Sequence, residues 1–200
     1  MDFQTLISGA SVRGEFLDFE TEGGVGPTKV DFEDCEFRNF DNAKWSPVGC
    51  TFLGCTFRAC NFSLGSWVDC TIRDCSFVSS KLTGTDFTRA NWTAFSGASP
   101  LRFQDCELSY ANFTRVRLGS AVFSRCRLPE TEFGGADLAG AQFIDCNLDG
   151  TNFQRANLPK ADFRTSYNFV IDPVISNVRG AMFSSATLRG LLDSFGIEIE

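Results

Sequence analysis

A large apolar residue recurs at every fifth position through most of the chain, and this spacing limits the folds that the chain can adopt. We call the recurring position i. In residues 103–163 all thirteen i positions are apolar, with Phe and Leu in strict alternation. An earlier block, residues 32–92, keeps the same step of five, and its two exceptions are Asn42 and Pro47. The two blocks differ in phase by one residue across residues 93–102.

The cysteines give an independent test of this repeat. Each of the nine lies two residues before an i position. Random placement would give each cysteine a one-in-five chance, so the joint chance is roughly one in two million, and internal repetition is the first explanation to consider. The remaining i−2 positions hold mostly Ala, Thr, Ser or Gly. The nine are Cys35, Cys50, Cys55, Cys60, Cys70, Cys75, Cys106, Cys126 and Cys146.

This period does not suit an α-helix, because a step of five residues turns a helix by about 140° beyond one full turn. In an extended segment, by contrast, residues two apart point to the same side. The i−2 and i side chains therefore point inward together, and the other residues of each pentad turn a corner. Four corners close a coil of about twenty residues, and coils stack at about 4.8 Å. The pattern predicts an all-β solenoid with one internal stack of Phe103, Phe123, Phe143 and Phe163.

The predicted solenoid covers residues 1–190. Near the start, Ile7, Val12 and Leu17 keep the phase of the first block, and near the end Phe183 keeps the phase of the second. The first of four expected interruptions is a loop rich in Gly, and the last is an irregular segment that we expect to loop out. The four lie near residues 20–29, 42–47, 93–102 and 166–177.

Residues 185–200 are predicted to form a short α-helix and a tail that serve for capping and dimerisation. An open coil edge would pair with other chains, so a solenoid needs a cap at each end. Ser184 or Ser185 is expected to N-cap this helix, and Gly196 suits its C-terminal end.

Composition limits the classes of function. The chain is 43% hydrophobic but has no apolar run near the ~20 residues of a membrane helix, and its N-terminus lacks a secretion signal. We therefore expect a cytoplasmic protein with no membrane contact. His is missing, which removes the usual general base and the commonest metal ligand. We expect no catalytic residues, no cofactor, no metal and no small-molecule substrate.

The repeat resembles the consensus A(D/N)LXX of the pentapeptide-repeat proteins, as in 136-ADLAGAQFIDCNLDG-150. The resemblance covers roughly residues 30–190 and implies a right-handed quadrilateral β-helix. Shorter stretches resemble the topoisomerase-protecting branch of that family, which includes the Qnr quinolone-resistance proteins, MfpA, AlbG and McbG. These stretches are 50-CTFLGCTFRACNF-62, the interruption after 91-NW-92, and the ending 167-YNFVID-172, 182-MFS-184 and 191-LLDSFGIEIE-200. The junction at residues 93–100 is short, so we do not expect the long projecting loops of some Qnr proteins. The chain therefore resembles the loop-poor AlbG or McbG kind more closely.

This resemblance implies a homodimer, joined through its C-terminal segments, that imitates duplex DNA. Such a protein binds DNA gyrase or topoisomerase IV and protects it from poisons of the quinolone, albicidin or microcin kind, giving antibiotic resistance or self-immunity. Direct nucleic-acid binding does not fit a net charge of −7. The alternative is a generic solenoid scaffold that binds some other cytosolic protein.

Two sets of residues are candidates for contacts with partners. The apolar residues of the C-terminal segment are expected either to cap the last coil or to form the dimer interface; they are Leu191, Leu192, Phe195, Ile197 and Ile199. Residues 1–41 hold ten acidic and three basic residues, whereas the rest of the chain holds fifteen of each. The acidic partner-binding candidates in this segment are Asp31, Glu33, Asp34 and Glu36, for which a merely solvated face is the simpler interpretation.

Other conspicuous residues have structural explanations. The cysteines form columns twenty residues apart, which favours buried thiols over a zinc site. Trp45 is large for an i−2 position, and with Phe95 it indicates either a distorted coil or a partner contact. The corner arginines Arg115, Arg125 and Arg155 are expected to pair with Asp105 and Asp145 of adjacent coils.

Overall fold

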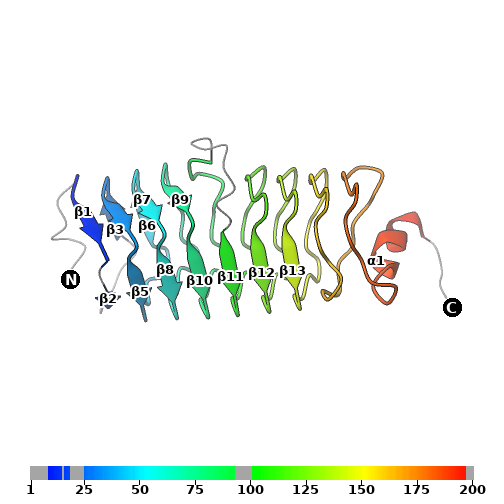
Figure 1. Cartoon of the computed structure of the whole chain (residues 1–200), viewed down its shortest axis with the longest axis horizontal. Helices are drawn as coiled ribbons and strands as arrows, with labels where there is room; N and C mark the ends of the chain where they lie inside the picture. Colours follow the sequence, from blue (N-terminus) through cyan, green and yellow to red (C-terminus); the bar gives the residue numbers. More distant parts are fainter. Residues whose placement is uncertain (1–8, 15, 19–24, 93–100, 197–200) are drawn as a thin grey trace.

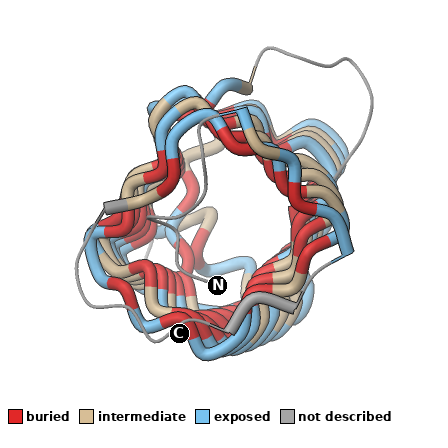
Figure 2. The backbone as a smooth tube through the Cα atoms, turned by 90° about the vertical axis from the view of Figure 1, so that its left-hand side faces the viewer, coloured by how far each residue is buried: buried red, intermediate tan, exposed pale blue. Residues whose placement is uncertain are grey.

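A computed structural model of the chain shows a rod-shaped β-solenoid with one short helix at its C-terminal end (Figure 1). The structure describes residues 9–14, 16–18, 25–92 and 101–196. Figure 2 looks along the rod and shows buried residues recurring at the same places in successive coils. The predicted fold class is confirmed.

The strands are short, because each is the extended part of a pentad between two corners. All but one have three residues. They are β1 Ser11–Arg13, β2 Phe16–Asp18, β3 Val25–Thr28, β4 Asp31–Glu33, β5 Glu36–Arg38, β6 Ser46–Val48, β7 Thr51–Leu53, β8 Thr56–Arg58, β9 Thr71–Arg73, β10 Ser76–Val78, β11 Arg102–Gln104, β12 Val122–Ser124 and β13 Gln142–Ile144.

Every strand pairing is parallel and joins one coil to the next. The sheets have the orders β1-β4-β7-β9, β13-β12-β11-β10-β8-β5-β2 and β3-β6. Most partners lie twenty residues apart, as in Phe32↔Phe52 and Phe103↔Phe123, and Val25 pairs with Ser46 at twenty-one. Between β10 and β11 the separation is twenty-six, because Phe77 pairs with Phe103. Six extra residues shift a period of five by one, which explains the phase change between the two blocks.

Phe side chains fill the rod in parallel stacks. The centroids of Phe103 and Phe123 lie 4.9 Å apart with an interplanar angle of 4°, and those of Phe123 and Phe143 lie 4.9 Å apart at 3°. Phe143 and Phe163 continue this stack at 4.7 Å. Across the rod the rings meet edge to face, as for Phe113 and Phe123 at 82°. Aromatic pairs favour both arrangements, so one spacing rule builds a continuous core.

Small residues at i−2 leave room for these rings and also bond to the backbone. All nine cysteines are buried. The Sγ atom of Cys126 lies 3.4 Å from the Phe103 carbonyl oxygen of the preceding coil. Thr131 Oγ1 donates to Leu108 O at 2.9 Å in the same way, and Ser166 Oγ donates to Phe143 O at 2.7 Å. Thiols and hydroxyls therefore satisfy carbonyl oxygens that face the core.

The predicted interruption at residues 42–47 is wrong. Asn42 is 3% exposed, Trp45 is 1% exposed, and β6 follows directly. The large side chains of Phe40 and Trp45 at i−2 fill the space that the small Asn42 and Pro47 leave at i. Gly65 lies above Trp45 in the next coil, where an added Cβ would be 2.5 Å from the Trp45 carbonyl oxygen. Trp45 is therefore a core residue.

Two other predicted interruptions are partly wrong. Residues 25–28 form β3 within the predicted loop, with a register shift against β6. Residues 166–177 keep the coil at both ends, through the bridges Asn147↔Tyr167 and Asn157↔Asn177. Phe169 and Ile171 of this segment are buried, because they replace the missing apolar residue at i.

The C-terminal helix begins later than predicted. α1 spans Arg189–Leu192 and is followed by the 3-10 helix η2, Asp193–Phe195. Leu188 is the N-cap residue of α1 and makes no side-chain cap bond, so the predicted cap at Ser184 or Ser185 is wrong. The backbone carbonyl oxygen of Ser184 instead accepts a 3.1 Å bond from Thr187 N in the preceding turn. The predicted end is confirmed, since Gly196 is left-handed with φ 64.

Candidate partner-binding surfaces

The four predicted acidic residues lie on β4, β5 and the corner between these strands. Asp31 and Asp34 are exposed, whereas Glu33 and Glu36 are partly buried. Asp34 occupies the corner with φ 54. The pentad thus brings the four residues to one corner of the coil.

Arginines neutralise two of these four carboxylates. Glu33 forms an ion pair with Arg13. Glu36 accepts bonds from Arg38 Nε at 2.8 Å and Arg58 Nε at 3.1 Å. The Arg38 hydrogen bond is the main reason that the pKa of Glu36 lies below its ordinary value, and Arg58 adds to it. Within the described residues, no ion pair involves Asp31 or Asp34.

Asp74 belongs to this surface, although it was not among the predicted acidic residues. It lies at the same corner as Asp34, two coils further along, because Glu33 pairs with Leu53 and Leu53 with Arg73. Gly54 lies between the two, and a Cβ there would be 2.4 Å from Asp34 Oδ1. Counting the pentad's corner positions for charge would have found Asp74. We call Asp31, Asp34 and Asp74 the acidic corner.

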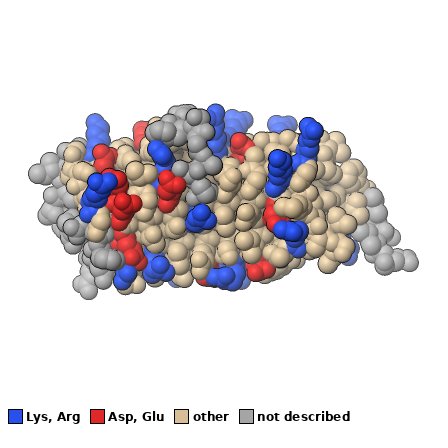
Figure 3. Space-filling model, in the orientation of Figure 1, with Lys and Arg blue, Asp and Glu red and all other residues tan. Residues whose placement is uncertain are grey.

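Elsewhere along the rod, acidic and basic side chains pair locally. Arg125 donates to Asp105 at 2.7 and 2.9 Å, as predicted, and this contact lowers the pKa of Asp105. Arg127 pairs with Glu107 at 2.9 Å. Figure 3 shows the acidic side chains of one face gathered towards the N-terminal end, with Lys and Arg among them. The predicted pairing is wrong for Arg115 and Arg155, which form no ion pair with any residue in the described ranges.

The predicted dimer residues divide between the core and the surface. Leu191 packs against the core, Leu192 is partly buried, and Phe195 is 51% exposed. Ile197 and Ile199 lie outside the described residues, as does Phe95. Ile171 N donates to Gly190 O at 2.9 Å, and a Cβ on Gly190 would be 2.1 Å from Phe169 O. Gly190 therefore lets α1 lie directly on the last coil.

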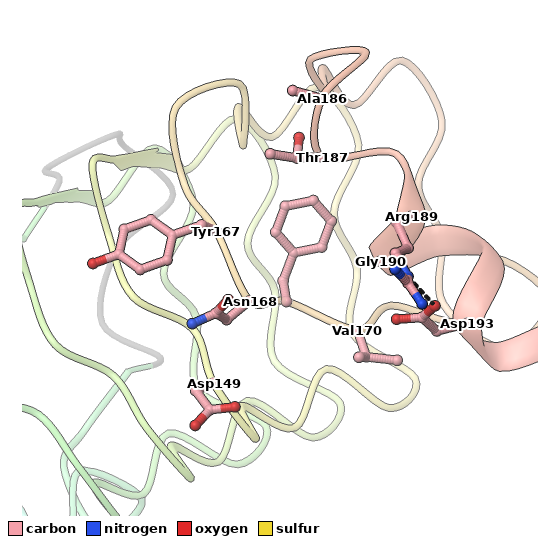
Figure 4. A pocket seen from close by; sticks show the side chains of 10 residues that line it. Asp149, Tyr167, Asn168, Val170, Ala186, Thr187, Arg189, Gly190 and Asp193 are labelled. Atoms are coloured by element: carbon pink, nitrogen blue, oxygen red, sulfur yellow. Dashed lines mark ion pairs between the residues drawn. The ribbon is translucent and has the colours of Figure 1, made fainter. Parts of the chain in front are cut away.

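A hollow of about 450 Å³ lies where α1 meets the last coil (Figure 4). Tyr167, Phe169, Arg189 and Asp193 are among its lining residues. Arg189 and Asp193 form an ion pair at 3.5 Å, and Tyr167 is 49% exposed. The hollow is thus a mixed aromatic and charged surface at the C-terminal end.

The C-terminal end of the rod exposes further apolar residues that are not among the predicted dimer-interface residues. Val174 is 75% exposed. Three of them lie in residues 166–177, which were expected to loop out, whereas Met182 and Leu188 follow that segment. Together with Phe195 we call them the C-terminal apolar surface: Val170, Val174, Ile175, Met182 and Leu188.

Two of the buried cysteines, Cys60 and Cys75, have the properties of structural thiols. Burial raises the pKa of Cys60 to about 12, so its thiol is neutral at physiological pH. Burial is also the first cause of the raised pKa of Cys75. A thiolate is the form that binds metals and attacks electrophiles. Across the described ranges, no group of three or more Cys, Asp or Glu is arranged to hold a metal ion.

The family follows from comparison of the sequence with family models. The model described as "Pentapeptide repeat region" matches residues 50–133 and 99–167, which together cover more than half of the chain. The chain therefore belongs to the pentapeptide-repeat family. No curated protein matches the sequence.

Solved structures of QnrB1, a plasmid-mediated fluoroquinolone resistance protein, share the fold. The trypsin-treated M102R form has 19% identity and a TM-score of 0.63, and the match covers 95% of this chain and 97% of that chain. The full-length form has 21% identity and a TM-score of 0.52, with 94% and 98% coverage. Separately, no helix in the described part of the chain has both the length and the apolar character needed to cross a bilayer.

Proposed function

We propose that this protein is a non-catalytic DNA mimic that binds DNA gyrase or topoisomerase IV in the cytoplasm and protects it from topoisomerase poisons. The observation that carries the proposal is the acidic corner on a rigid rod. Asp31, Asp34 and Asp74 are exposed and form no ion pair with other described residues. The shared fold with QnrB1 over 95% of the chain supports the same proposal.

The physical basis is competition for a cationic surface. DNA-binding proteins gain affinity mainly by neutralising phosphates. Asp34 and Asp74 lie two coils apart, which corresponds to about 9.6 Å along the rod at the usual interstrand spacing. A rigid row of carboxylates loses little conformational entropy on binding, so it can compete with the phosphates of DNA for the same cationic surface. Unlike DNA, it has no phosphodiester bond that the enzyme could cleave.

We further propose that two chains associate through the C-terminal apolar surface. Exposed apolar clusters on soluble proteins mark interaction sites more often than chance contacts. Val174, Val170 and Phe195 supply the most exposed large side chains of this surface. Such a dimer would place one acidic corner near each outer end of a longer rod.

The test is a gyrase supercoiling and DNA-cleavage assay in which the protein is titrated against a quinolone and, separately, against albicidin. Restored supercoiling together with fewer trapped cleavage complexes is the expected result. Inhibition alone would show that the protein occupies the DNA site without protecting the enzyme. No effect on gyrase or topoisomerase IV would refute the proposal.

A solenoid scaffold for another cytosolic protein is the second candidate. The observation that favours it is the local charge balance, because Glu33 and Glu36 are neutralised by arginines. A scaffold would leave both topoisomerase assays unchanged while the protein remains folded and dimeric.

A further inference from the structure

A polar hollow of about 300 Å³ lies on the side of the rod formed by the bridges Asn112↔Glu132 and Glu132↔Asn152. It spans three successive coils. Thr114 and Arg115 line it from the first coil, and Gln154 and Arg155 line it from the third. This hollow lies at a different corner of the coil from the acidic corner.

Two consecutive glycines in the middle coil create the hollow. Gly134 and Gly135 occupy the positions that Thr114 and Arg115 hold in the coil before, so two side chains are missing from the wall. Gly135 is left-handed with φ 66, and a Cβ there would be 3.3 Å from Arg115 Cγ. A Cβ on Gly134 would meet nothing closer than Asn152 Nδ2 at 3.7 Å.

The two arginines beside the gap have free guanidinium groups. Arg115 and Arg155 are exposed, and neither forms an ion pair or a side-chain hydrogen bond with any residue that the structure describes. This contrasts with Arg125 and Arg127, which both bond to carboxylates of the preceding coil. Arg115 and Arg155 are two coils apart, or about 9.6 Å along the rod at the usual spacing.

We propose that this hollow binds an acidic peptide segment of a partner protein, whose carboxylates bond to Arg115 and Arg155. Guanidinium groups bind carboxylates through paired, charge-assisted hydrogen bonds. Carboxylates on alternate residues of an extended peptide lie about 7 Å apart, within the reach of two flexible arginine side chains. The missing side chains at residues 134–135 leave room for the peptide backbone.

A peptide fits this site better than a nucleic acid does. Glu132 lines the hollow, and its Oε2 accepts a 2.7 Å bond from Asn152 Nδ2. This carboxylate repels a continuous phosphate backbone but accepts a bond from a peptide N–H.

The binding test is an NMR titration of the whole isotope-labelled protein with the peptide acetyl-Glu-Ala-Glu-Ala-Glu-amide, followed through arginine Nε–Hε signals. We expect saturable shifts of the Arg115 and Arg155 signals and of the Gly134 and Gly135 amides. Arg117 and Arg179, on another side of the coil, serve as internal controls and should not move. Absent shifts, or equal shifts at all four arginines, would overturn the proposal. Larger shifts with a DNA duplex than with the peptide would overturn it in favour of nucleic acid.

Two matched pairs of variants separate the site from general charge and folding effects. Arg115→Gln with Arg155→Gln should weaken peptide binding about tenfold or more, since bonds between charged groups contribute about 1.5–3 kcal/mol. Arg117→Gln with Arg179→Gln removes the same charge and should leave binding unchanged. Equal effects of the two pairs would contradict a defined site.

The second pair fills space instead of removing charge. Gly134→Val should abolish binding by closing the hollow, and the chain tolerates Val there because Val68 holds the equivalent position of an earlier coil. Gly119→Val, at the same pentad position on another side, should have no effect on binding. Melting temperatures measured for both variants show that each is folded. Undiminished binding by a folded Gly134→Val variant would also overturn the proposal.

Discussion

Replacing Gly65 with Ala should destabilise the protein, although the local backbone would by itself favour the change. Neither Gly65 nor the comparison residue Gly134 has a left-handed φ. Gly→Ala at such a position stabilises a protein by about 0.4–1 kcal/mol, because it restricts the unfolded chain. At Gly65, however, the new Cβ would lie 2.5 Å from the Trp45 carbonyl oxygen and 2.9 Å from that of Phe62.

Both contacts are with backbone oxygens that already accept hydrogen bonds, one from the next coil and one within a turn. Trp45 O accepts a 3.0 Å bond from Ser66 N, and Phe62 O accepts a 2.9 Å bond from Gly65 N. The clash therefore cannot be relieved by rotating a side chain. Overpacking costs about 1–3 kcal/mol, and a contact of 2.5 Å with a backbone atom belongs in the upper half of that range, so the net loss should be about 1–2.5 kcal/mol. For a chain of this size, that loss lowers the melting temperature by roughly 2–10 °C.

Gly134→Ala is the matched control, because its Cβ would have no neighbour closer than 3.7 Å. It should raise the melting temperature by roughly 1–4 °C. Urea unfolding of both variants measures the two free energies of unfolding, and the slopes show whether cooperativity is kept. If Gly65→Ala proved neutral or stabilising, the argument that Gly65 accommodates the coil of Trp45 would be refuted.

Four further outcomes are expected. Phe195→Asp should convert dimers to monomers in analytical ultracentrifugation, and dimers of this variant would contradict the proposed interface. Phe123→Ala removes a fully buried, stacked ring and should cost about 3–5 kcal/mol in urea unfolding, and a loss below 1 kcal/mol would contradict the continuous core. Because its folded pKa is lowered, Glu36 stabilises the protein above its unfolded pKa of about 4.3, and this contribution is lost as pH falls through the folded value. An NMR carboxyl titration should therefore show a higher pKa for Glu36 in an Arg38→Gln variant, and an unchanged value would contradict the assigned cause. Cys60 should resist thiol reagents at pH 8 until the protein unfolds, whereas rapid labelling of the native protein would contradict its burial.

The sequence predicted the coil well because its period is a direct consequence of pentad geometry. The stack of Phe103 to Phe163, the buried cysteines and the phase change after residue 92 all depend on local spacing, which a single chain reveals. Errors arose where a large residue at i−2 compensates for a small one at i of the same pentad. Asn42 and Pro47 look like breaks until Phe40 and Trp45 are seen to fill the same space.

The candidate surfaces were harder to predict, because charge pairing depends on which coils are neighbours in space. Glu33 looked like a free carboxylate until Arg13 was found one coil away, whereas Asp74 lies far from Asp34 in sequence but at the same corner. Val174 and Ile175 are apolar residues in a segment without the repeat, so the period did not predict whether their side chains face the core or the solvent.

The most direct measurement of the central claim is displacement of a labelled DNA duplex from gyrase, followed by fluorescence anisotropy. The variant Asp31→Asn, Asp34→Asn, Asp74→Asn should displace DNA much less well than the unaltered protein. Asn tolerates the left-handed corners at residues 34 and 74, so the fold should persist. The control Glu130→Gln, Asp145→Asn, Asp149→Asn removes three exposed charges elsewhere and should displace DNA normally. Equal displacement by all three proteins, or by none, would contradict the account that the acidic corner takes the place of DNA.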